Sequence, residues 1–179
     1  MQPYIAMLRG INVSGQKKIK MADFKKHLQQ LNFKDVQTYI QSGNAVFKNK
    51  KSTPKALEEK IAKKILDEYG FEVSVIVKNP EELRNVLKNN PFVKDKDLNR
   101  LYVTFLSDEP KQDNLKKLKG IDQGPEEYVL KGKIIYGYAP HGYGKAKMSN
   151  NFFENKLKVT ATTRNWKTVN KLADMANSG

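Results

Sequence analysis

Two stretches of the chain are built alike: residues 39–47, YIQSGNAVF, and residues 128–136, YVLKGKIIY. Each has β-prone residues on both sides of a glycine, Gly43 in the first stretch and Gly132 in the second. Two strand-like runs joined through a glycine are typical of a β-hairpin, because glycine accepts the positive φ that a tight turn needs. The sequence therefore predicts one such hairpin in each half of the chain.

The segments around the first hairpin predict strands and helices in alternation. A short apolar run at 4–8 is typical of a buried strand, and apolar residues at helical spacing within 21–31 predict a helix. After the hairpin, the Thr-Pro pair at 53–54 is a helix start, and Gly70 ends the apolar stripe that follows. Residues 71–78 are then expected to form a closing strand.

The second half repeats this order and then departs from it. Residues 102–106 predict a strand, and a Lys-rich stretch at 112–119 takes the place of the first helix before the hairpin. Helices are expected near 149–157 and 164–175. We therefore predict an α+β fold, a tandem duplication of ferredoxin-like (βαββαβ) units. The expected domains are a first unit at 1–78, a connecting helix and loop at 79–99, and a second unit with a C-terminal helix at 100–179.

The composition excludes several classes of protein. The chain has 179 residues and no Cys, which excludes a disulfide framework, a thiolate zinc site and a Cys nucleophile. No apolar run approaches the roughly 18 residues that span a bilayer. The N-terminus lacks a secretory signal, so we expect a cytoplasmic protein that does not enter the membrane. The two histidines form no metal-binding pair, and we expect neither a metal nor a cofactor.

The net charge of +14 comes from 29 Lys and only 4 Arg. Basic chains tend to meet nucleic acid or other polyanions. A dedicated nucleic-acid surface, however, more often clusters its charge and uses Arg, whose planar fork matches phosphate geometry. The basic residues are spread over both halves of the chain. This favours a solvated lysine surface and leaves a nucleic-acid partner as the alternative.

Three motifs resemble those of one bacterial family. They are LRGINVSG at 8–15 with KMAD at 20–23, TYIQSGN at 38–44, and ATTRNW at 161–166 with TV at 168–169 and KL at 171–172. In this order they are similar to the signature motifs of domain-of-unknown-function family 1697, except that Ser14 stands where glycine is commoner. The resemblance spans nearly the whole chain. It implies duplicated ferredoxin-like halves and carries no particular chemistry.

The loop at 10–20 is the first candidate site. Gly10 and Gly15 are spaced as in a phosphate-binding P-loop, but Gln16 stands where that loop needs lysine, which argues against a nucleotide hydrolase. Glycines and basic residues in this loop still predict an anion-binding concavity. The candidate residues are Arg9, Asn12, Lys17, Lys18 and Lys20. The alternative is a glycine-requiring turn whose lysines face water.

Ser42 and Asn44 flank Gly43 in the first hairpin and are the second candidates. Their residue types are those that a tight turn favours, so a purely structural role is the alternative to ligand binding.

The loop at 136–147, YGYAPHGYGKAK, is the third candidate site. It combines a flexible glycine backbone with His141, Tyr143 and Lys145, which suits stacking on a base or sugar while a phosphate is held. A plain connecting loop is the alternative.

The start of the last helix is the fourth candidate. We expect Thr162 or Thr163 to cap this helix and Arg164 and Asn165 to lie in its first turn, where backbone N–H groups favour an anion. The alternative for Arg164 is a structural ion pair with a carboxylate.

These candidates support three functions, and none of them identifies a catalytic residue. The leading hypothesis is a protein that binds a phosphate-bearing ligand, either a phosphorylated small molecule or nucleic acid, through its glycine-rich basic loops and a helix N-terminus. The first alternative is a small-metabolite enzyme with its site between the two halves, although the sequence does not show that any reaction is catalysed. The second alternative is a protein-interaction or homodimer module, and the sequence leaves the oligomeric state open.

Overall fold

The computed structural model describes residues 1–178 and is a mixed α+β structure. The chain forms two compact units, Met1–Asn85 together with the segment from Lys171 onward, and Val86–Asn170. Each unit contains one four-stranded antiparallel sheet, and six α-helices are distributed along the described residues. None of these helices combines the length and the apolar character that crossing a membrane requires.

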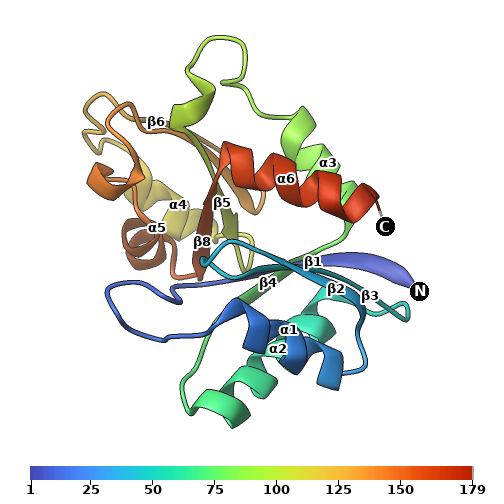
Figure 1. Cartoon of the computed structure of the whole chain (residues 1–179). Coiled ribbons are helices and arrows are strands. Elements are labelled where there is room, and N and C mark those ends of the chain that lie inside the picture. The colour runs from blue at the N-terminus through green and yellow to red at the C-terminus, as the bar shows by residue number, and fades with distance from the viewer. Residues whose placement is uncertain (179) are drawn as a thin grey trace. The chain divides into compact units, whose positions relative to one another are not determined.

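The sheet of the first unit has the strand order β2-β3-β1-β4, and every neighbouring pair is antiparallel. The elements are β1 (Gln2–Leu8), α1 (Met21–Gln30), β2 (Lys34–Tyr39), β3 (Asn44–Asn49), α2 (Pro54–Tyr69) and β4 (Val75–Lys78), and α3 (Pro80–Lys88) follows them. Helices α1 and α2 lie on the same face of this sheet (Figure 1). The predicted hairpin and both predicted helices of this half are confirmed.

Local sequence explains where helix α2 begins and ends. The Thr53 hydroxyl accepts the backbone N–H of Ala56 at 3.2 Å, a cap that typically contributes about 1 kcal/mol. Gly70 ends the helix with a φ of 74°, a conformation that costs glycine little. The closing strand is shorter than predicted and begins at Val75 instead of residue 71. Its partner β1 ends at Leu8, directly opposite Val75, and beyond this pair the Arg9 N–H donates to the Ser74 carbonyl at 2.9 Å without extending the strand.

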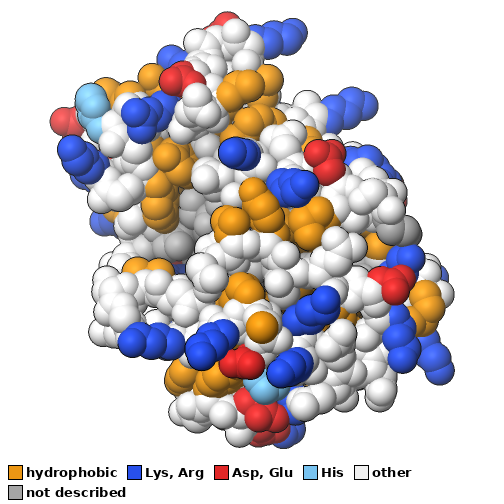
Figure 2. All heavy atoms as spheres, viewed as in Figure 1, with side chains coloured by type: hydrophobic (Ala, Val, Ile, Leu, Met, Phe, Trp, Pro, Cys, Tyr) orange, Lys and Arg blue, Asp and Glu red, His pale blue; other side chains and the backbone are white. Residues whose placement is uncertain are grey.

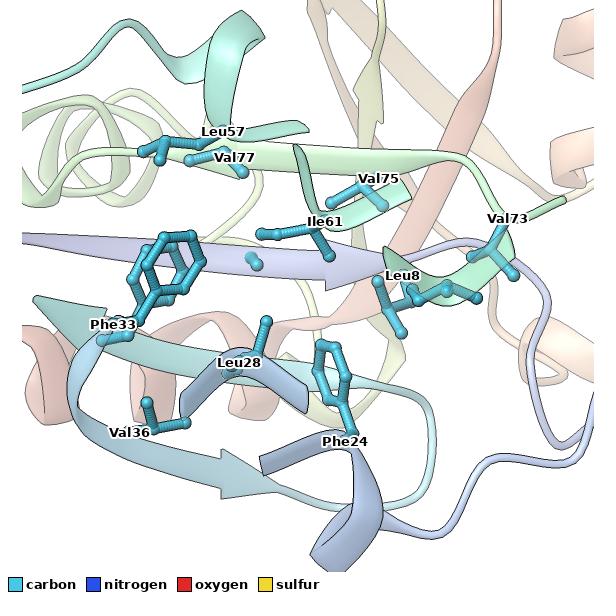
Figure 3. Packing of buried hydrophobic residues seen from close by; sticks show 14 of the residues in the cluster. Leu8, Phe24, Leu28, Phe33, Val36, Leu57, Ile61, Val73, Val75 and Val77 are labelled. Carbon is cyan, nitrogen blue, oxygen red and sulfur yellow. The ribbon is translucent and has the colours of Figure 1, made fainter. Parts of the chain in front are cut away.

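The core of the first unit fills the space between its sheet and helices α1 and α2 (Figure 3). Phe24 and Leu28 come from α1 and Leu57 comes from α2, and all three side chains are buried. The rings of Phe33 and Phe47 stack with their centroids 4.3 Å apart. Burial of each large apolar side chain contributes roughly 1.5–3 kcal/mol, so this cluster is the main force that holds the helices on the sheet.

The sheet of the second unit has the order β6-β7-β5-β8, again with antiparallel neighbours. The elements are the 3₁₀ turn η1 (Leu98–Arg100), β5 (Leu101–Leu106), α4 (Gln112–Leu115), η2 (Lys116–Leu118), β6 (Glu127–Lys131), β7 (Ile134–Tyr138), η3 (Tyr143–Lys145), α5 (Asn150–Leu157) and β8 (Ala161–Asn165), and α6 (Trp166–Asn177) follows. Phe153 and Leu157 of α5 pack in a buried cluster with Leu106, Ile135 and Ala161 of the sheet.

The prediction for residues 162–165 is wrong. Thr162, Thr163 and Arg164 do not begin the last helix but lie in strand β8, where they face Phe105, Thr104 and Val103 of β5. Without β8, one edge of β5 would leave its backbone N–H and C=O groups without partners. The last helix starts at Trp166, and the Asn165 side chain accepts the backbone N–H of Thr168 at 2.8 Å. Strand β8 also means that the second half completes the element order of the first.

The predicted domain boundaries, 1–78, 79–99 and 100–179, were drawn along the chain from the order of the predicted strands. The compact units are divided differently, because the segment from Lys171 onward belongs to the first unit. The predicted division therefore stays a prediction.

Candidate functional site

The loop between β1 and α1 is wound tightly by residues in the left-handed region. Backbone φ is positive at Gly10 (68°), Asn12 (55°), Ser14 (52°), Gly15 (73°) and Lys17 (47°). Three of these residues are not glycine, and such residues keep a positive φ only where surrounding contacts hold them. The loop reverses between Val13 and Gln16, whose backbone O and N atoms lie 3.0 Å apart. The loop therefore has a defined shape.

Asn12 holds this shape through its side-chain amide. Its Nδ2 atom donates to the carbonyl oxygens of Ile19 at 2.9 Å and Gln41 at 2.8 Å, and its Oδ1 atom accepts the N–H of Ile19 at 2.9 Å. The sequence predicted Asn12 as an anion ligand. In the structure its amide nitrogen already donates to two backbone carbonyls, so the Asn12 side chain fixes the shape of the loop instead of binding an anion.

Two other candidates of this loop lie outside the groove that it forms. Lys17 donates from Nζ to the carbonyl oxygen of Glu72 at 2.8 Å, which fixes the far side of the loop. Arg9 follows the last residue of β1, and its backbone N–H donates to Ser74 at 2.9 Å. Neither side chain lines the groove described below.

The turn around Gly43 is hydrogen-bonded to the end of β1, where the loop begins. The Leu8 N–H donates to the Gly43 carbonyl at 2.8 Å. Asn44 is buried, and its Nδ2 atom donates to the Tyr39 carbonyl at 2.9 Å and to the Ser42 hydroxyl at 3.0 Å. The structure thus brings the motifs at 8–15 and 38–44 together. Ser42 and Asn44 build the turn, as their structural alternative predicted.

An open groove of about 520 Å³ lies beside the loop. Its polar and charged lining comprises Asn12, Lys18, Lys20, Asp23, Gln41 and Tyr69. Lys18 and Lys20 are exposed, and neither ammonium group has a hydrogen bond or ion pair with any residue in 1–178. A groove of this volume falls within the range of small-molecule sites. We call it the basic groove.

The wall formed by helices α1 and α2 carries a tyrosine–histidine pair. Tyr69 Oη lies 3.0 Å from Nε2 of His27, and the two rings meet edge to face with centroids 5.4 Å apart. Burial raises the pKa of Tyr69, and the negative charges of Asp23 and Glu68 add to this effect. The Tyr69 phenol therefore stays neutral across the physiological range. In the described part of the chain, no group of three or more His, Asp or Glu side chains could hold a metal ion.

Sequence reasoning missed this wall for two reasons. Tyr69 is spaced as the last member of the apolar stripe of α2, and His27 lies at the edge of the stripe of α1. The two residues are 42 positions apart, so only the packing of α1 against α2 brings them together. No periodicity could have revealed the pair.

In the second unit, Tyr143 and Thr163 join one hydrogen-bonded network. Thr163 Oγ1 lies 2.7 Å from Thr104 Oγ1, 2.6 Å from Asn150 Oδ1 and 3.4 Å from Tyr143 Oη. Tyr143 Oη also accepts the backbone N–H of Asn150 at 2.9 Å. A cavity of about 20 Å³ lies beside Tyr102, Thr104 and Tyr143, which is room for roughly one water molecule. The network anchors the loop before α5 to the sheet.

His141 and Lys145 are exposed on this loop, and neither lines the cavity beside Tyr143. Their side chains form no hydrogen bond or ion pair with the described residues. Neither side chain therefore joins the hydrogen-bonded network of Tyr143, with which the sequence grouped them.

Strand β8 gives the remaining candidates structural positions. Arg164 is 7% exposed, and its Nη1 atom donates to the Thr163 carbonyl at 2.9 Å. Burial lowers the pKa of Arg164 to about 10, so its guanidinium is still protonated at neutral pH. Thr162 is fully buried, and Asn165 caps α6. Thr162, Thr163 and Arg164 lie in strand β8 and do not form the first turn of a helix as predicted, whereas Asn165 lies at the N-terminus of α6 and caps it.

The two antiparallel sheets and their covering helices define a mixed α+β protein of two units with a basic groove in the first. A family model described as "Protein of unknown function (DUF1697)" matches residues 1–136, and the chain belongs to this family. The chain is also similar to the solved structure of a conserved bacterial protein from Streptococcus pneumoniae, with 26% identity and a TM-score of 0.75 over 97% of this chain and 98% of that chain. Among curated proteins, none matches this chain.

Proposed function

We propose that this protein binds a small phosphate-bearing ligand in the basic groove of its first unit. The proposal rests on one observation: Lys18 and Lys20 line the groove, and no acidic side chain in 1–178 neutralises either of them. Two ammonium groups on one concave surface attract a dianion more strongly than scattered surface lysines do, because their fields add over a low-dielectric wall. A phosphate monoester has the matching charge.

The shape of the loop supports this proposal. Lys18 follows a segment whose turns are fixed by Asn12 and by the Lys17–Glu72 contact. Ile19 is buried between the two groove lysines and anchors them to the core. A preformed site loses less conformational entropy when a ligand binds, which favours affinity.

A small ligand fits better than nucleic acid. A groove of about 520 Å³ accommodates a metabolite and does not form a continuous channel along a strand. On the face shown in Figure 2, Lys and Arg side chains are dispersed among Asp, Glu and neutral side chains and do not form one stripe. Nucleic acid therefore remains only a weaker alternative.

We also propose that the two units are ferredoxin-like folds related by tandem duplication. Both follow the element order βαββαβ. When the strands of each unit are counted from its first strand, both sheets also have the same spatial order: second, third, first, fourth. On this proposal the chain divides into repeats at 1–78 and 100–179, joined by 79–99.

The test is a titration with inorganic phosphate and ethyl phosphate at fixed ionic strength, followed by amide chemical shifts in NMR spectra. We expect shifts concentrated in residues 12–23, and we expect Lys18→Ala/Lys20→Ala to weaken binding by at least about tenfold, roughly 1.4 kcal/mol. The matched control is Lys25→Ala/Lys26→Ala, which removes the same charge from exposed positions of α1 that do not line the groove. Equal losses in the two double variants, or no binding by the unaltered protein, would contradict the proposal.

A further inference from the structure

The basic groove is not uniformly basic, because Asp23 also lines it. The Asp23 carboxylate forms no ion pair with Lys18, Lys20 or any other residue within 1–178. A carboxylate in this position repels a phosphate, so it lowers the affinity of the groove for a ligand that carries only negative charge. Electrostatic complementarity instead favours a ligand that brings a positive group to Asp23.

Tyr69 lines the groove together with Asp23, and its hydroxyl is hydrogen-bonded to His27. Tyr69 Oη lies 3.0 Å from Nε2 of His27, and either atom can be the donor. A phenol oxygen has two lone pairs, so in either arrangement at least one of them is available to accept a hydrogen bond from a donor in the groove.

Asp23 and Tyr69 both line the groove. Burial is the largest cause of the raised pKa of Tyr69, and the negative charges of Asp23 and Glu68 add to it. Of these two carboxylates, Glu68 is paired with Lys64 at 2.6 Å and does not line the groove. The groove therefore has a cationic part at Lys18 and Lys20 and an acceptor part formed by Asp23 and Tyr69.

We propose that the ligand of the basic groove is zwitterionic, a phosphate monoester that carries an ammonium group a few bonds from the phosphate. Lys18 and Lys20 bind the phosphate, and the Asp23 carboxylate and the Tyr69 oxygen accept hydrogen bonds from the ammonium group. This inference rests on the proposed function and adds the second half of the ligand to it.

Two probes of nearly equal size separate the two halves of the site. O-phosphoethanolamine carries both charges, and ethyl phosphate lacks the ammonium group. We expect the unaltered protein to bind O-phosphoethanolamine at least about tenfold more tightly than ethyl phosphate at neutral pH, about 1.4 kcal/mol, because the ammonium group adds a charge-assisted hydrogen bond.

Asp23→Asn should reduce this preference to less than about twofold while leaving the affinity for ethyl phosphate equal or higher, since a repulsive charge is removed. Tyr69→Phe should reduce the preference less, and it keeps the stacking of the ring on Phe71, whose centroid lies 5.5 Å away. The control is Asp67→Asn, which removes an exposed carboxylate paired with Lys63 outside the groove. Thermal melting of each variant verifies that it is folded.

Each result has one meaning. Equal affinity of the unaltered protein for the two probes overturns the zwitterion inference and leaves the proposed phosphate site intact. If Asp23→Asn still prefers O-phosphoethanolamine to ethyl phosphate, the zwitterion inference is also overturned. The role of Asp23 is then to stabilise the first turn of α1. Failure of both probes to bind overturns the proposed function together with this inference.

Discussion

Gly43 and Gly132 occupy the same place in two similar hairpins, yet their surroundings differ. Both have positive φ, 88° at Gly43 and 61° at Gly132. A Cβ atom at Gly43 would lie 2.7 Å from Cδ1 of Ile11 and 2.9 Å from Cβ of Leu8, whereas a Cβ atom at Gly132 would meet nothing within 4 Å. At Gly43, therefore, both the backbone conformation and the lack of a side chain are required.

We expect Gly43→Ala to lower the free energy of unfolding by about 2–4 kcal/mol, from left-handed strain and from overpacking against Leu8 and Ile11. Gly132→Ala is the matched control and should cost only the strain, roughly 1–2 kcal/mol. Urea unfolding of the two variants measures both quantities. Equal losses would mean that the close approach of Ile11 to Gly43 relaxes without cost.

At the scale of the secondary-structure elements, Tyr136 of β7 makes a buried hydrogen bond to Val86, and both residues belong to the second unit. The Tyr136 hydroxyl donates to the Val86 carbonyl at 2.8 Å, and the Tyr136 side chain is 2% exposed. Burial raises the pKa of Tyr136 to about 12. The ordinary tyrosine value is about 10, so the folded state retains this proton at a pH where the unfolded chain loses it.

This pKa difference predicts a loss of stability in base. Below about pH 10 the phenol is protonated in both states and adds no pH dependence, whereas between about pH 10 and 12 the unfolded state ionises first and folding weakens. Relative to Tyr136→Phe, the unaltered protein should lose about 1–1.5 kcal/mol by pH 11, which is half of the roughly 2–3 kcal/mol that is lost once the pH exceeds 12. Guanidinium unfolding of both proteins at about pH 8 and pH 11 measures the difference, in which lysine titration cancels. A difference that does not change with pH would show that Tyr136 ionises alike in both states.

At the scale of the whole molecule, the net charge of +14 is carried by 29 Lys and 4 Arg. The two lysines of the basic groove are a small part of this charge, and the basic side chains on the face shown in Figure 2 are dispersed. Dispersed lysines neutralise few phosphates of any one polyanion, and such contacts weaken steeply as salt displaces them.

We therefore expect labelled single-stranded and duplex DNA to bind weakly at about 50 mM salt and to be released by about 200 mM, as followed by fluorescence anisotropy. Lys18→Ala/Lys20→Ala and Lys25→Ala/Lys26→Ala should change this binding by similar amounts, because both variants lose the same charge. Micromolar binding that persists at the higher salt, and that only the groove variant abolishes, would instead make nucleic acid the ligand of the groove.

The sequence by itself determined the features that depend on neighbours along the chain. Helix α2 could be predicted with both of its ends because Thr53, Pro54 and Gly70 set the backbone locally. The hairpins at Gly43 and Gly132 followed from glycine between β-prone runs. The motifs at 8–15 and 38–44 lie within the residues that the family model matches, whereas the motif at 161–172 lies beyond them. Of the lysines in the first candidate loop, Lys18 and Lys20 line the groove and Lys17 does not, and ligand binding by this loop stays a prediction.

Only the tertiary structure decided the features that depend on residues far apart. Residues 162–164 carry helix-cap signals, but pairing with the open edge of β5 outweighs these local preferences and makes them a strand. Asn12 has the right chemistry for an anion, but the carbonyl of Gln41 already occupies its amide. The pair formed by Tyr69 and His27 exists because α1 and α2 pack on one face of a sheet. Local energies fix where elements begin and end, whereas burial and hydrogen bonding over long separations decide which side chains meet.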